Sequence, residues 1–426
     1  MGRIILPKLH SGQLDIWNNQ GQYNVVRCGR RFGKTKLLEW LAGRGIVKGL
    51  KVGIFTPENK QLAEPWDHLV ETLNDVIVSK NRNEGTIKCE GGGKIDVWTT
   101  NDNDLAGRGR EYHLTLVDEA AFTKSPQMRD EIWRKAIKPT MLTTRGQAWV
   151  FSTPNGLDPD NFFYSACNDK SLGFKEFYAP TSANPYVPPD ELEKERLLND
   201  PRVFQQEYLA QFVDWSGSAF FATEKMLVDG NPVPYPDRCD GVFAIMDTAV
   251  KGGKENDGTA VVYCAINKWV GHPLVILDWD IIQVDGALLE TYLPTVFERL
   301  EELAKMTQSR YGVVGTFIED AAAGSILIQQ GRSRGWNTHA IDSKLTSVGK
   351  DERAISVSGH YFQEKLKISE YAYNKTTNFK GVTRNHLLSQ VGQFRIGDKD
   401  AHKRADDLLD CFTYAIAIGV GDKYGF

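Results

Sequence analysis

A glycine-rich segment near the start of the chain combines residue types that hold phosphate groups. A strand-like apolar run ends at Cys28, and Gly29–Thr35 (GRRFGKT) leads directly into an apolar helix-like run. Phosphate oxygens need backbone N–H donors, a lysine and a hydroxyl that binds Mg²⁺. Gly33, Lys34 and Thr35 supply this set at a helix start, where the dipole also favours anions. The segment predicts a phosphate-binding loop for ATP, although Cys28 occupies the first-glycine position of GxxxxGK[ST]; an ordinary glycine turn is the alternative.

Two adjacent carboxylates close a later apolar run, Leu114–Val117. We expect Asp118 to hold Mg²⁺, directly or through water, and Glu119 to polarise the attacking water in ATP hydrolysis. Such a pair is commonly only a solvated turn. Here it follows Lys34 by about 84 residues, with two strand-like segments between them. The combination predicts the catalytic site of a nucleotide-driven motor.

Further polar residues flank these motifs. Ser152 and Thr153 follow a strand-like run, where helicase-like motors sense the γ-phosphate, and Gln13 precedes the first strand, where such motors often contact adenine. A strand-end turn and a surface glutamine are the alternatives. Arginines that could stabilise transition-state charge, in cis or from a neighbouring subunit, are Arg30, Arg31, Arg108, Arg110, Arg134 and Arg145. We predict Arg30 as a phosphate contact in cis, with Arg145 and Arg134 as weaker predictions for an arginine finger.

A separate set of carboxylates lies in the second half. Asp247 and Glu319 each end a strand-like run, and Asp407 and Asp410 share one face at the start of an apolar helix. Mg²⁺ prefers carboxylate oxygens, and two such ions about 3.5–4 Å apart clamp the attacking and leaving oxygens of a phosphodiester. Acidic residues favour strand ends and helix N-termini in any case. The ordered set nevertheless predicts a two-metal nuclease with Asp247, Glu319 and either Asp407 or Asp410 as ligands.

The elements that must position these residues differ between the halves. In the first half, strand-length runs alternate with helical stretches, which predicts a parallel sheet covered on both faces. The expected strands are Tyr23–Cys28, Lys51–Phe55, Lys94–Thr99, His113–Val117 and Gln147–Ser152, and the expected helices Lys34–Leu41, Glu64–Val78 and Gln127–Met141. Later strands are expected at Gly241–Asp247, Thr259–Ile266, Leu274–Asp280 and Val313–Ile318, before a helix at Ala401–Ile418. We expect a motor domain at 1–180, a proline-rich connecting region at 181–238 and a nuclease domain at 239–426.

Composition narrows the class of protein. The chain has 426 residues, 41% hydrophobic and 25% charged, so it has enough apolar residues for large cores and is not disordered. Six cysteines without a CxxC pattern argue against a disulfide framework or a zinc site and favour a reducing cytosol. No apolar run approaches the ~18 residues that cross a bilayer, so we expect a soluble protein with no membrane partner. The net charge of -4 argues against nonspecific coating of nucleic acid, but leaves room for local phosphate contacts at Lys344–Arg353 and Lys399–Arg404.

With both sets of motifs in this order, the chain resembles the large terminase subunit of tailed bacteriophages over nearly its full length. The carriers are Gly29–Thr35, Val117–Glu119, Ser152–Pro154, Asp247, Glu319 and Asp406–Asp410, with Gln205–Leu209 and Lys350–Arg353 as softer support. The resemblance implies an α/β protein in two parts. These are an N-terminal P-loop (ASCE-type, helicase-like) parallel-sheet ATPase domain and a C-terminal ribonuclease H-like α/β nuclease domain.

The resemblance also implies a function. A viral DNA-packaging motor uses ATP hydrolysis to drive double-stranded DNA into the procapsid, and its endonuclease cuts concatemeric DNA when packaging starts and ends. The implied cofactors are ATP and Mg²⁺, with Mn²⁺ able to replace Mg²⁺ in the nuclease site. The implied partners are the small terminase subunit, the portal protein of the procapsid and further copies of this chain. Those copies form a ring, commonly a pentamer, on the portal vertex in the host cytoplasm, while the free subunit is often monomeric.

Other classes of protein stay open at this point. A helicase or remodelling ATPase would use the same loop, but should carry a second helicase-type motor lobe with an arginine finger, rather than the carboxylate set, after residue 240. Such an ATPase with a fused nuclease, not involved in packaging, is a further alternative. A non-catalytic DNA-binding scaffold would tolerate loss of every carboxylate. A standalone resolvase-like nuclease leaves the first 180 residues unexplained. Headful and site-specific cutting are equally compatible with the sequence.

Overall fold

The computed structural model describes residues 4–101, 106–123, 127–215, 219–248, 258–283, 289–320, 323–398 and 405–421. The chain divides into two compact units, here called the N-unit (Met1–Leu197 and Pro201–Asp214) and the C-unit (Leu198–Asp200 and Trp215–Phe426). The segment 181–238 is shared between them, and our three-part division stays a prediction. In the described part of the chain, every helix is too short or too polar to cross a membrane.

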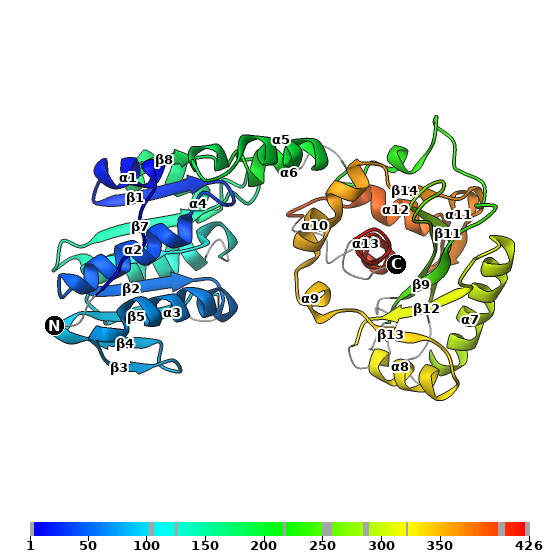
Figure 1. Ribbon diagram of the computed structural model, residues 1–426, viewed down its shortest axis with the longest axis horizontal. Helices are drawn as coiled ribbons and strands as arrows, with labels where there is room; N and C mark the ends of the chain where they lie inside the picture. The colour runs from blue at the N-terminus through cyan, green and yellow to red at the C-terminus, as the bar shows by residue number, and fades with distance from the viewer. Residues whose placement is uncertain are drawn as a thin grey trace. The chain divides into compact units, whose positions relative to one another are not determined.

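The N-unit is built on an eight-stranded sheet in the order β3-β4-β5-β2-β6-β7-β1-β8 (Figure 1). Its strands are β1 (Tyr23–Cys28), β2 (Lys51–Thr56), β3 (Ile77–Asn81), β4 (Thr86–Cys89), β5 (Lys94–Thr99), β6 (Leu114–Val117), β7 (Gln147–Ser152) and β8 (Phe174–Ala179). The strands from β5 to β8 in this order all pair in parallel, and β4 runs antiparallel to both of its neighbours, β3 and β5. Every residue of β6 is buried, as expected for a central strand covered on both faces.

Helices cover both faces of this sheet. Adjacent residues of β1 face opposite ways: Val26 joins a core with helices α2 and α3, and Val25 joins a core with Trp133 and α4. The helices are α1 (Ser11–Asn18), α2 (Lys34–Val47), α3 (Asn59–Leu73), α4 (Phe162–Asn168), α5 (Pro189–Leu198) and α6 (Pro201–Glu207). The helix expected at Gln127–Met141 is a π-helix over Gln127–Ile137 followed by a 3-10 turn, in which Pro139 supplies no backbone N–H.

The C-unit is built on a six-stranded mixed sheet in the order β13-β12-β9-β10-β11-β14. The strands are β9 (Gly241–Asp247), β10 (Thr259–Ile266), β11 (Leu274–Ile282), β12 (Val313–Ile318), β13 (Thr338–Ala340) and β14 (Leu366–Ile368), and β15 (Thr377–Phe379) and β16 (Val382–Arg384) form a separate hairpin. β10 runs antiparallel to both of its neighbours, whereas the other pairs are parallel.

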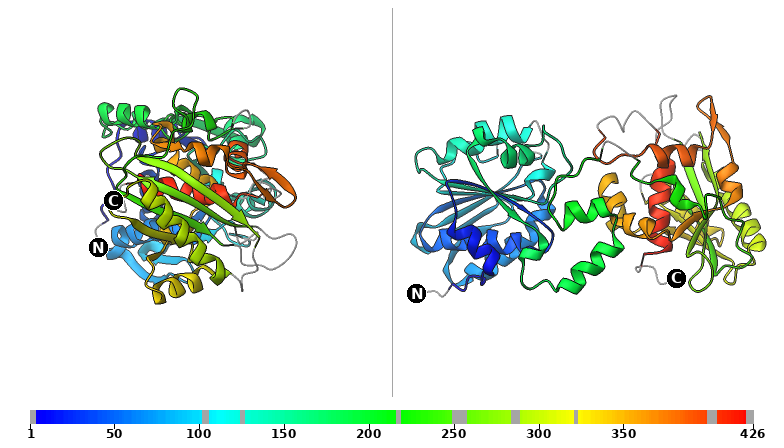
Figure 2. Two further views of the ribbon diagram at one scale, coloured as in Figure 1. Left: turned by 90° about the vertical axis from the view of Figure 1, so that its right-hand side faces the viewer. Right: turned by 90° about the horizontal axis from the view of Figure 1, so that it is seen from above.

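Helices lie on both faces of this sheet as well. The elements are α7 (Leu289–Met306), α8 (Ala323–Ser333), α9 (Ser343–Thr346), α10 (Lys350–Phe362), α11 (Glu370–Asn374), α12 (His386–Gln393) and α13 (Asp407–Gly419). α7 and α8 share a core with β9 and β12, while α13, red in Figure 2, packs across β9 and β10 together with α10 and α12. α13 begins at Asp407, and residues 401–404 of the predicted helix and the basic stretch 399–404 lie outside the described residues.

Candidate functional sites

The loop between β1 and α2 presents an uncapped helix N-terminus. Gly33 has a φ of 101°, in the left-handed region that favours glycine, and offers no side chain to cap α2. A Cβ at Gly29 would lie 2.8 Å from the backbone nitrogen of Thr181. The first backbone N–H groups of a helix have no partner within the helix, and with the dipole they attract anions. The loop therefore fits a phosphate group, and both glycines are needed for its shape.

Lys34 links this loop to the two predicted carboxylates. β1, β6 and β7 pair in parallel, so their carboxyl ends meet at one edge of the sheet. There the Lys34 ammonium lies 3.4 Å from Asp118 Oδ1 and also pairs with Glu119. Burial alone would lower the pKa of Lys34, but the two carboxylates outweigh it and raise that pKa. Burial raises the pKa of Asp118, and Lys34 opposes this change. Lys34 is thus held charged beside the loop.

The predicted phosphate-sensing segment contacts one of these carboxylates, Glu119. Ser152 Oγ lies 3.4 Å from Glu119 Oε2 as a donor and accepts a bond from the Ala121 backbone N–H at 3.2 Å. Glu119 itself has a φ of 48°. Cys28 is buried directly under the loop, its Sγ 3.7 Å from Ser152 O, and burial raises the pKa of its thiol to about 12. We call Cys28–Thr35 with Asp118, Glu119 and Ser152 the P-loop site.

Gln13 contacts the loop from α1. Its side-chain Nε2 donates to Gly33 O at 2.7 Å, and its Oε1 accepts from the His10 backbone N–H at 3.0 Å. The His10 ring is in turn bonded to Phe32 O at 2.7 Å. Both polar atoms of the side-chain amide thus contact the loop and the start of α1, and the contact with adenine stays a prediction. In this arrangement the side chain positions the loop.

The arginines divide by distance from the P-loop site. Arg30 pairs with Glu207 of α6, and its backbone N–H donates to Glu207 O at 2.7 Å. Arg145 lies two residues before β7, at the opposite end of that strand from Ser152. Arg145 and Ser152 are therefore about 20 Å apart at ~3.3 Å per residue. Arg134 is exposed on the π-helix and lies 3.5 Å from Asp130. An arginine-finger role for Arg145 would therefore require a second subunit, and it stays a prediction.

The second set of carboxylates also meets at a sheet edge. β9 and β12 are parallel, with Ile318 opposite Met246. The next residues along the two strands, Asp247 and Glu319, therefore lie at adjacent strand ends. Asp407 is buried in the first turn of α13, and its Oδ2 accepts from the Gly258 backbone N–H at 3.2 Å. We call Asp247, Glu319, Asp407 and Asp410 the carboxylate cluster.

The electrostatics of this cluster suit a divalent cation. Burial raises the pKa of Asp247 well above its ordinary value, and the carboxylates of Asp410, Asp407 and Glu319 raise it further, against the effect of Lys350. A donor set of carboxylate oxygens is one that Mg²⁺ and Mn²⁺ accept. Among the residues that the structure describes, no three His, Cys, Asp or Glu side chains already lie at metal-binding distances. The residue types fit the metal, and binding it would draw the side chains closer together.

Asp407 and Asp410 differ in their partners. Asp410 Oδ1 pairs with Arg353 and its Oδ2 lies 2.9 Å from Lys350, so cations of α10 occupy both oxygens. Lys350 also pairs with Asp406. Arg353 is buried and donates from Nε to Thr413 Oγ1 at 3.1 Å. The two cations on Asp410 make it the less available carboxylate for a metal, and the choice between Asp407 and Asp410 stays a prediction.

Comparison with known proteins points to one family. The family described as the N-terminal part of the T4likevirus-type terminase large subunit matches residues 26–227. The large terminase subunits of Thermus phage G20c and Thermus virus P23-45 are each 30% identical over 149 residues, which cover 31% of this chain and 28% of theirs. The chain is therefore similar to phage large terminase subunits, and the family match covers residues 26–227 of its 426. The chain spans well under two thirds of the length of these two relatives.

Solved large terminases share the fold. The large terminase of a thermophilic bacteriophage covers 96% of this chain and 99% of its own, with a TM-score of 0.60 at 13% identity. A structure of the same phage protein in complex with ATP-gamma-S has a TM-score of 0.59 at 12% identity. At such identity the likeness is one of fold. The predicted α/β fold in two parts, the first built on a largely parallel sheet, is confirmed.

Three residues that contact these two sites lay in strings that the sequence singled out for other reasons. Glu207, the partner of Arg30, belongs to Gln205–Leu209, and Lys350 and Arg353 belong to the basic stretch 344–353. Lysine and arginine three residues apart on a helix share one face, which was a usable signal. Gln390 lies in an unremarkable stretch, and only the structure places it at the start of α13.

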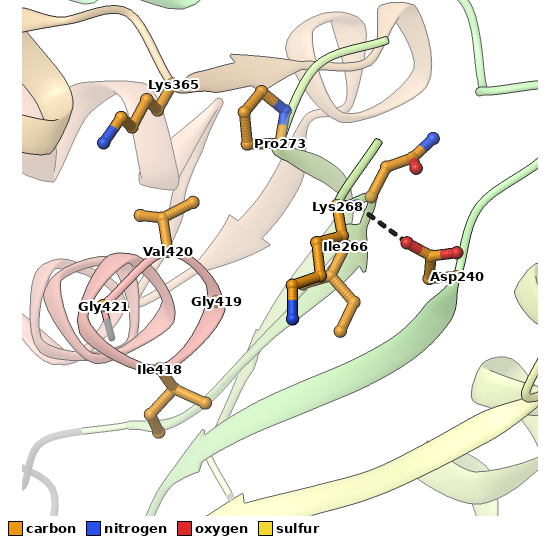
Figure 3. A pocket seen from close by; sticks show the side chains of 10 residues that line it. Asp240, Ile266, Lys268, Pro273, Lys365, Ile418, Gly419, Val420 and Gly421 are labelled. Atoms are coloured by element: carbon orange, nitrogen blue, oxygen red, sulfur yellow. Dashed lines mark hydrogen bonds between the residues drawn. The ribbon is translucent and has the colours of Figure 1, made fainter. Parts of the chain in front are cut away.

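A pocket of about 330 Å³ lies at the other end of the C-unit sheet. Asp240, Ile266, Lys268 and Lys365 line it, and the Lys268 backbone N–H donates to Asp240 at 2.7 Å (Figure 3). Ile266 pairs with Gly241, at the opposite end of β9 from the carboxylate cluster. The separation is about 20 Å at ~3.3 Å per residue. This pocket is therefore not part of the carboxylate cluster.

Proposed function

We propose that the chain is an ATP-driven motor and endonuclease that packages viral double-stranded DNA. The observation that carries the proposal is the Lys34 ammonium between Asp118 and Glu119, beside an uncapped helix N-terminus. The same chain holds the carboxylate cluster in its C-unit. The match of residues 26–227 to the large terminase family supports the combination of the two activities in one packaging protein.

The P-loop site is proposed to hydrolyse ATP. The backbone N–H groups at Gly33–Thr35 bind the phosphate chain, and Lys34 turns from its carboxylates to the β- and γ-phosphates. Thr35 and Asp118 would hold Mg²⁺, which when bound neutralises charge that develops on the phosphates. Glu119, released by Lys34, orients and activates the attacking water. Ser152 contacts Glu119 and the Ala121 backbone. A change at Glu119 when the γ-phosphate is lost can therefore change the conformation of the segment that follows β7.

The carboxylate cluster is proposed to cut DNA. Asp247, Glu319 and Asp407 would hold Mg²⁺, with Mn²⁺ able to replace it. Two bound ions would stabilise the attacking and leaving oxygens. Asp410 is proposed to fix the first turn of α13 through Lys350 and Arg353. Contacts to the DNA backbone carry little sequence information, so we expect weakly specific cleavage.

The partners follow from the packaging role. We propose double-stranded DNA as substrate, the portal protein of the procapsid and the small terminase subunit as partners, and a ring of copies, commonly a pentamer, on the portal vertex in the host cytoplasm. The alternative of a helicase without a nuclease called for a second motor lobe after residue 240. The C-unit instead folds around one mixed sheet that carries the carboxylate cluster.

The test measures both activities on one full-length protein. We expect Lys34→Ala to abolish ATP hydrolysis but leave Mn²⁺-dependent cleavage of plasmid DNA, and Asp247→Ala to do the reverse. Addition of procapsids with portal should stimulate ATP hydrolysis by the wild type. Normal turnover of ATP by Lys34→Ala would refute the motor, and undiminished cutting by the Asp247→Ala, Glu319→Ala double variant would refute the nuclease.

A further inference from the structure

The start of α13 is held by a residue outside that helix. The N-cap residue Asp406 makes no side-chain bond to the first turn. Instead, Gln390 Oε1 accepts from the backbone N–H groups of Leu408 at 2.8 Å and Leu409 at 3.3 Å. A side-chain oxygen that accepts from the second and third residues of a helix is the usual N-cap arrangement. Here α12 supplies that oxygen from 18 positions earlier in the chain.

The position of Gln390 is itself well fixed. The side chain is 6% exposed, on the buried face of α12. α12 starts at a conventional cap, because Asn385 Oδ1 accepts from the Leu388 backbone N–H at 2.9 Å. His386, in the first turn, is bonded to Thr377 O and Val382 O at 3.1 and 3.0 Å. The oxygen that caps α13 is therefore carried by a helix anchored at its own start.

The capped turn is the one that carries two members of the carboxylate cluster. Asp407 directly precedes Leu408, and Asp410 directly follows Leu409. The Asp410 backbone N–H closes the first helical bond, to Asp406 O, at 3.1 Å. Any rotation of this turn would move both carboxylates relative to Asp247. The cations of α10 contact side chains, those of Asp406, Asp410 and Thr413, whereas Gln390 Oε1 contacts the backbone between Asp407 and Asp410.

We propose that Gln390 is a positioning residue for the metal site. By capping α13 it sets where Asp407 presents its carboxylate to a divalent cation; the inference rests on the proposed nuclease function. Outer partners that orient metal ligands commonly affect metal affinity by about 10–100-fold. The Gln390 Nε2 has no partner among the described residues. The oxygen is thus the part of the side chain that acts, and glutamate should replace glutamine better than an isosteric apolar residue.

The experiment measures Mn²⁺ binding to the full-length protein without nucleotide, by electron paramagnetic resonance of the free ion. The site is defined as the binding lost in Asp247→Ala. We expect Gln390→Met to weaken this binding about tenfold and Gln390→Glu to recover it to within about threefold. The matched control is Gln393→Met: Gln393 lies on the same helix and lines the same small pocket, with Lys350 and Asp406. It should bind Mn²⁺ as the wild type does. Melting temperatures of all variants are recorded without metal.

Each outcome decides the question. Weaker binding by Gln390→Met with recovery by Gln390→Glu, and wild-type binding by Gln393→Met, supports the positioning role. A lower melting temperature of Gln390→Met with unchanged Mn²⁺ affinity overturns it, because Gln390 would then only stabilise the fold. An equal loss in Gln393→Met overturns it too. If the wild type has no binding that depends on Asp247, the nuclease proposal itself fails, and the role of Gln390 fails with it.

Discussion

The P-loop site and the carboxylate cluster both gather acidic side chains where parallel strands end, but they neutralise them in different ways. In the P-loop site one lysine, Lys34, contacts both Asp118 and Glu119. In the carboxylate cluster three carboxylates raise the pKa of Asp247 and a single lysine lowers it, and that lysine pairs with Asp406 and Asp410. The P-loop site thus contains the counter-ion of its carboxylates, whereas in the carboxylate cluster the lysine lies beside Asp406 and Asp410 and not beside Asp247.

This difference in the position of the cations predicts which ligand changes the state of each site. Lys34 can move from its carboxylates to the phosphates, so binding of a nucleotide both holds the substrate and releases Glu119. In the described part of the chain, the lysine that acts on Asp247, Lys350, pairs with Asp406 and Asp410 instead, and a divalent cation would supply positive charge at Asp247. We therefore expect the P-loop site to be stable without ligand and the carboxylate cluster to gain stability from metal.

The largest expected effect is on ATP hydrolysis. Glu119→Gln removes the carboxylate that activates water and should lower kcat by about 10²–10⁴-fold, the usual contribution of a general base. DNA cleavage should be unchanged, because the cluster uses other residues. The matched control is Glu111→Gln, an exposed carboxylate that pairs with Lys51 in the same unit. Steady-state phosphate release measures the effect, and a kcat within threefold of the wild type would remove Glu119 from the mechanism.

The next largest difference is expected between substitutions of the two aspartates of α13, Asp407 and Asp410. Asp410→Asn leaves the buried Arg353 without its ionic partner, and breaking a buried pair commonly costs about 3–5 kcal/mol. Asp407→Asn should cost less stability but abolish Mn²⁺-dependent cleavage. Chemical denaturation and a nicking assay on both variants test this. Loss of cleavage in a well-folded Asp410→Asn, with normal cleavage in Asp407→Asn, would reverse the assignment of the ligand.

A pH-dependent effect is expected at Asp247. Its pKa is raised in the folded protein, so the stability that it contributes is present at low pH and is lost as the pH rises and the group ionises. Without metal, Asp247→Asn should therefore melt above the wild type near pH 8, by about 2–4 °C for each ~1 kcal/mol relieved, and the gain should vanish near pH 4. Added Mg²⁺ should raise the melting temperature of the wild type alone. A variant that is less stable at pH 8 would contradict the electrostatic account.

The sequence predicted much of the two sites because their residues end strands or begin helices. Parallel strands bring such ends to one edge, so Lys34, Asp118 and Ser152 could be grouped without a structure. The contacts that tune the sites come from side chains distant in sequence, such as Glu207 on Arg30 and Gln390 on α13. Their spacing has no period to detect. The edge strand β3 was also missed, because four of its five residues are exposed and carry no strand pattern.

The smallest effect is expected from the two cysteines that lie beneath these sites. Cys28 Sγ contacts Ser152 O under the P-loop site, and Cys411 Sγ contacts Ala260 O at 3.5 Å under the carboxylate cluster. Burial raises the pKa of each thiol, so both stay protonated and unreactive at pH 8. Iodoacetamide should modify neither cysteine in the native protein, as peptide mass spectrometry would detect. Cys28→Ala should keep ATP hydrolysis within about threefold of the wild type, because the Cys28 side chain takes no part in binding the phosphates, which contact backbone N–H groups of the loop. The contrary result would be rapid alkylation of Cys28 that abolishes ATP hydrolysis and that ATP prevents. It would mean that the loop opens in the absence of nucleotide although Lys34 pairs with Asp118 and Glu119.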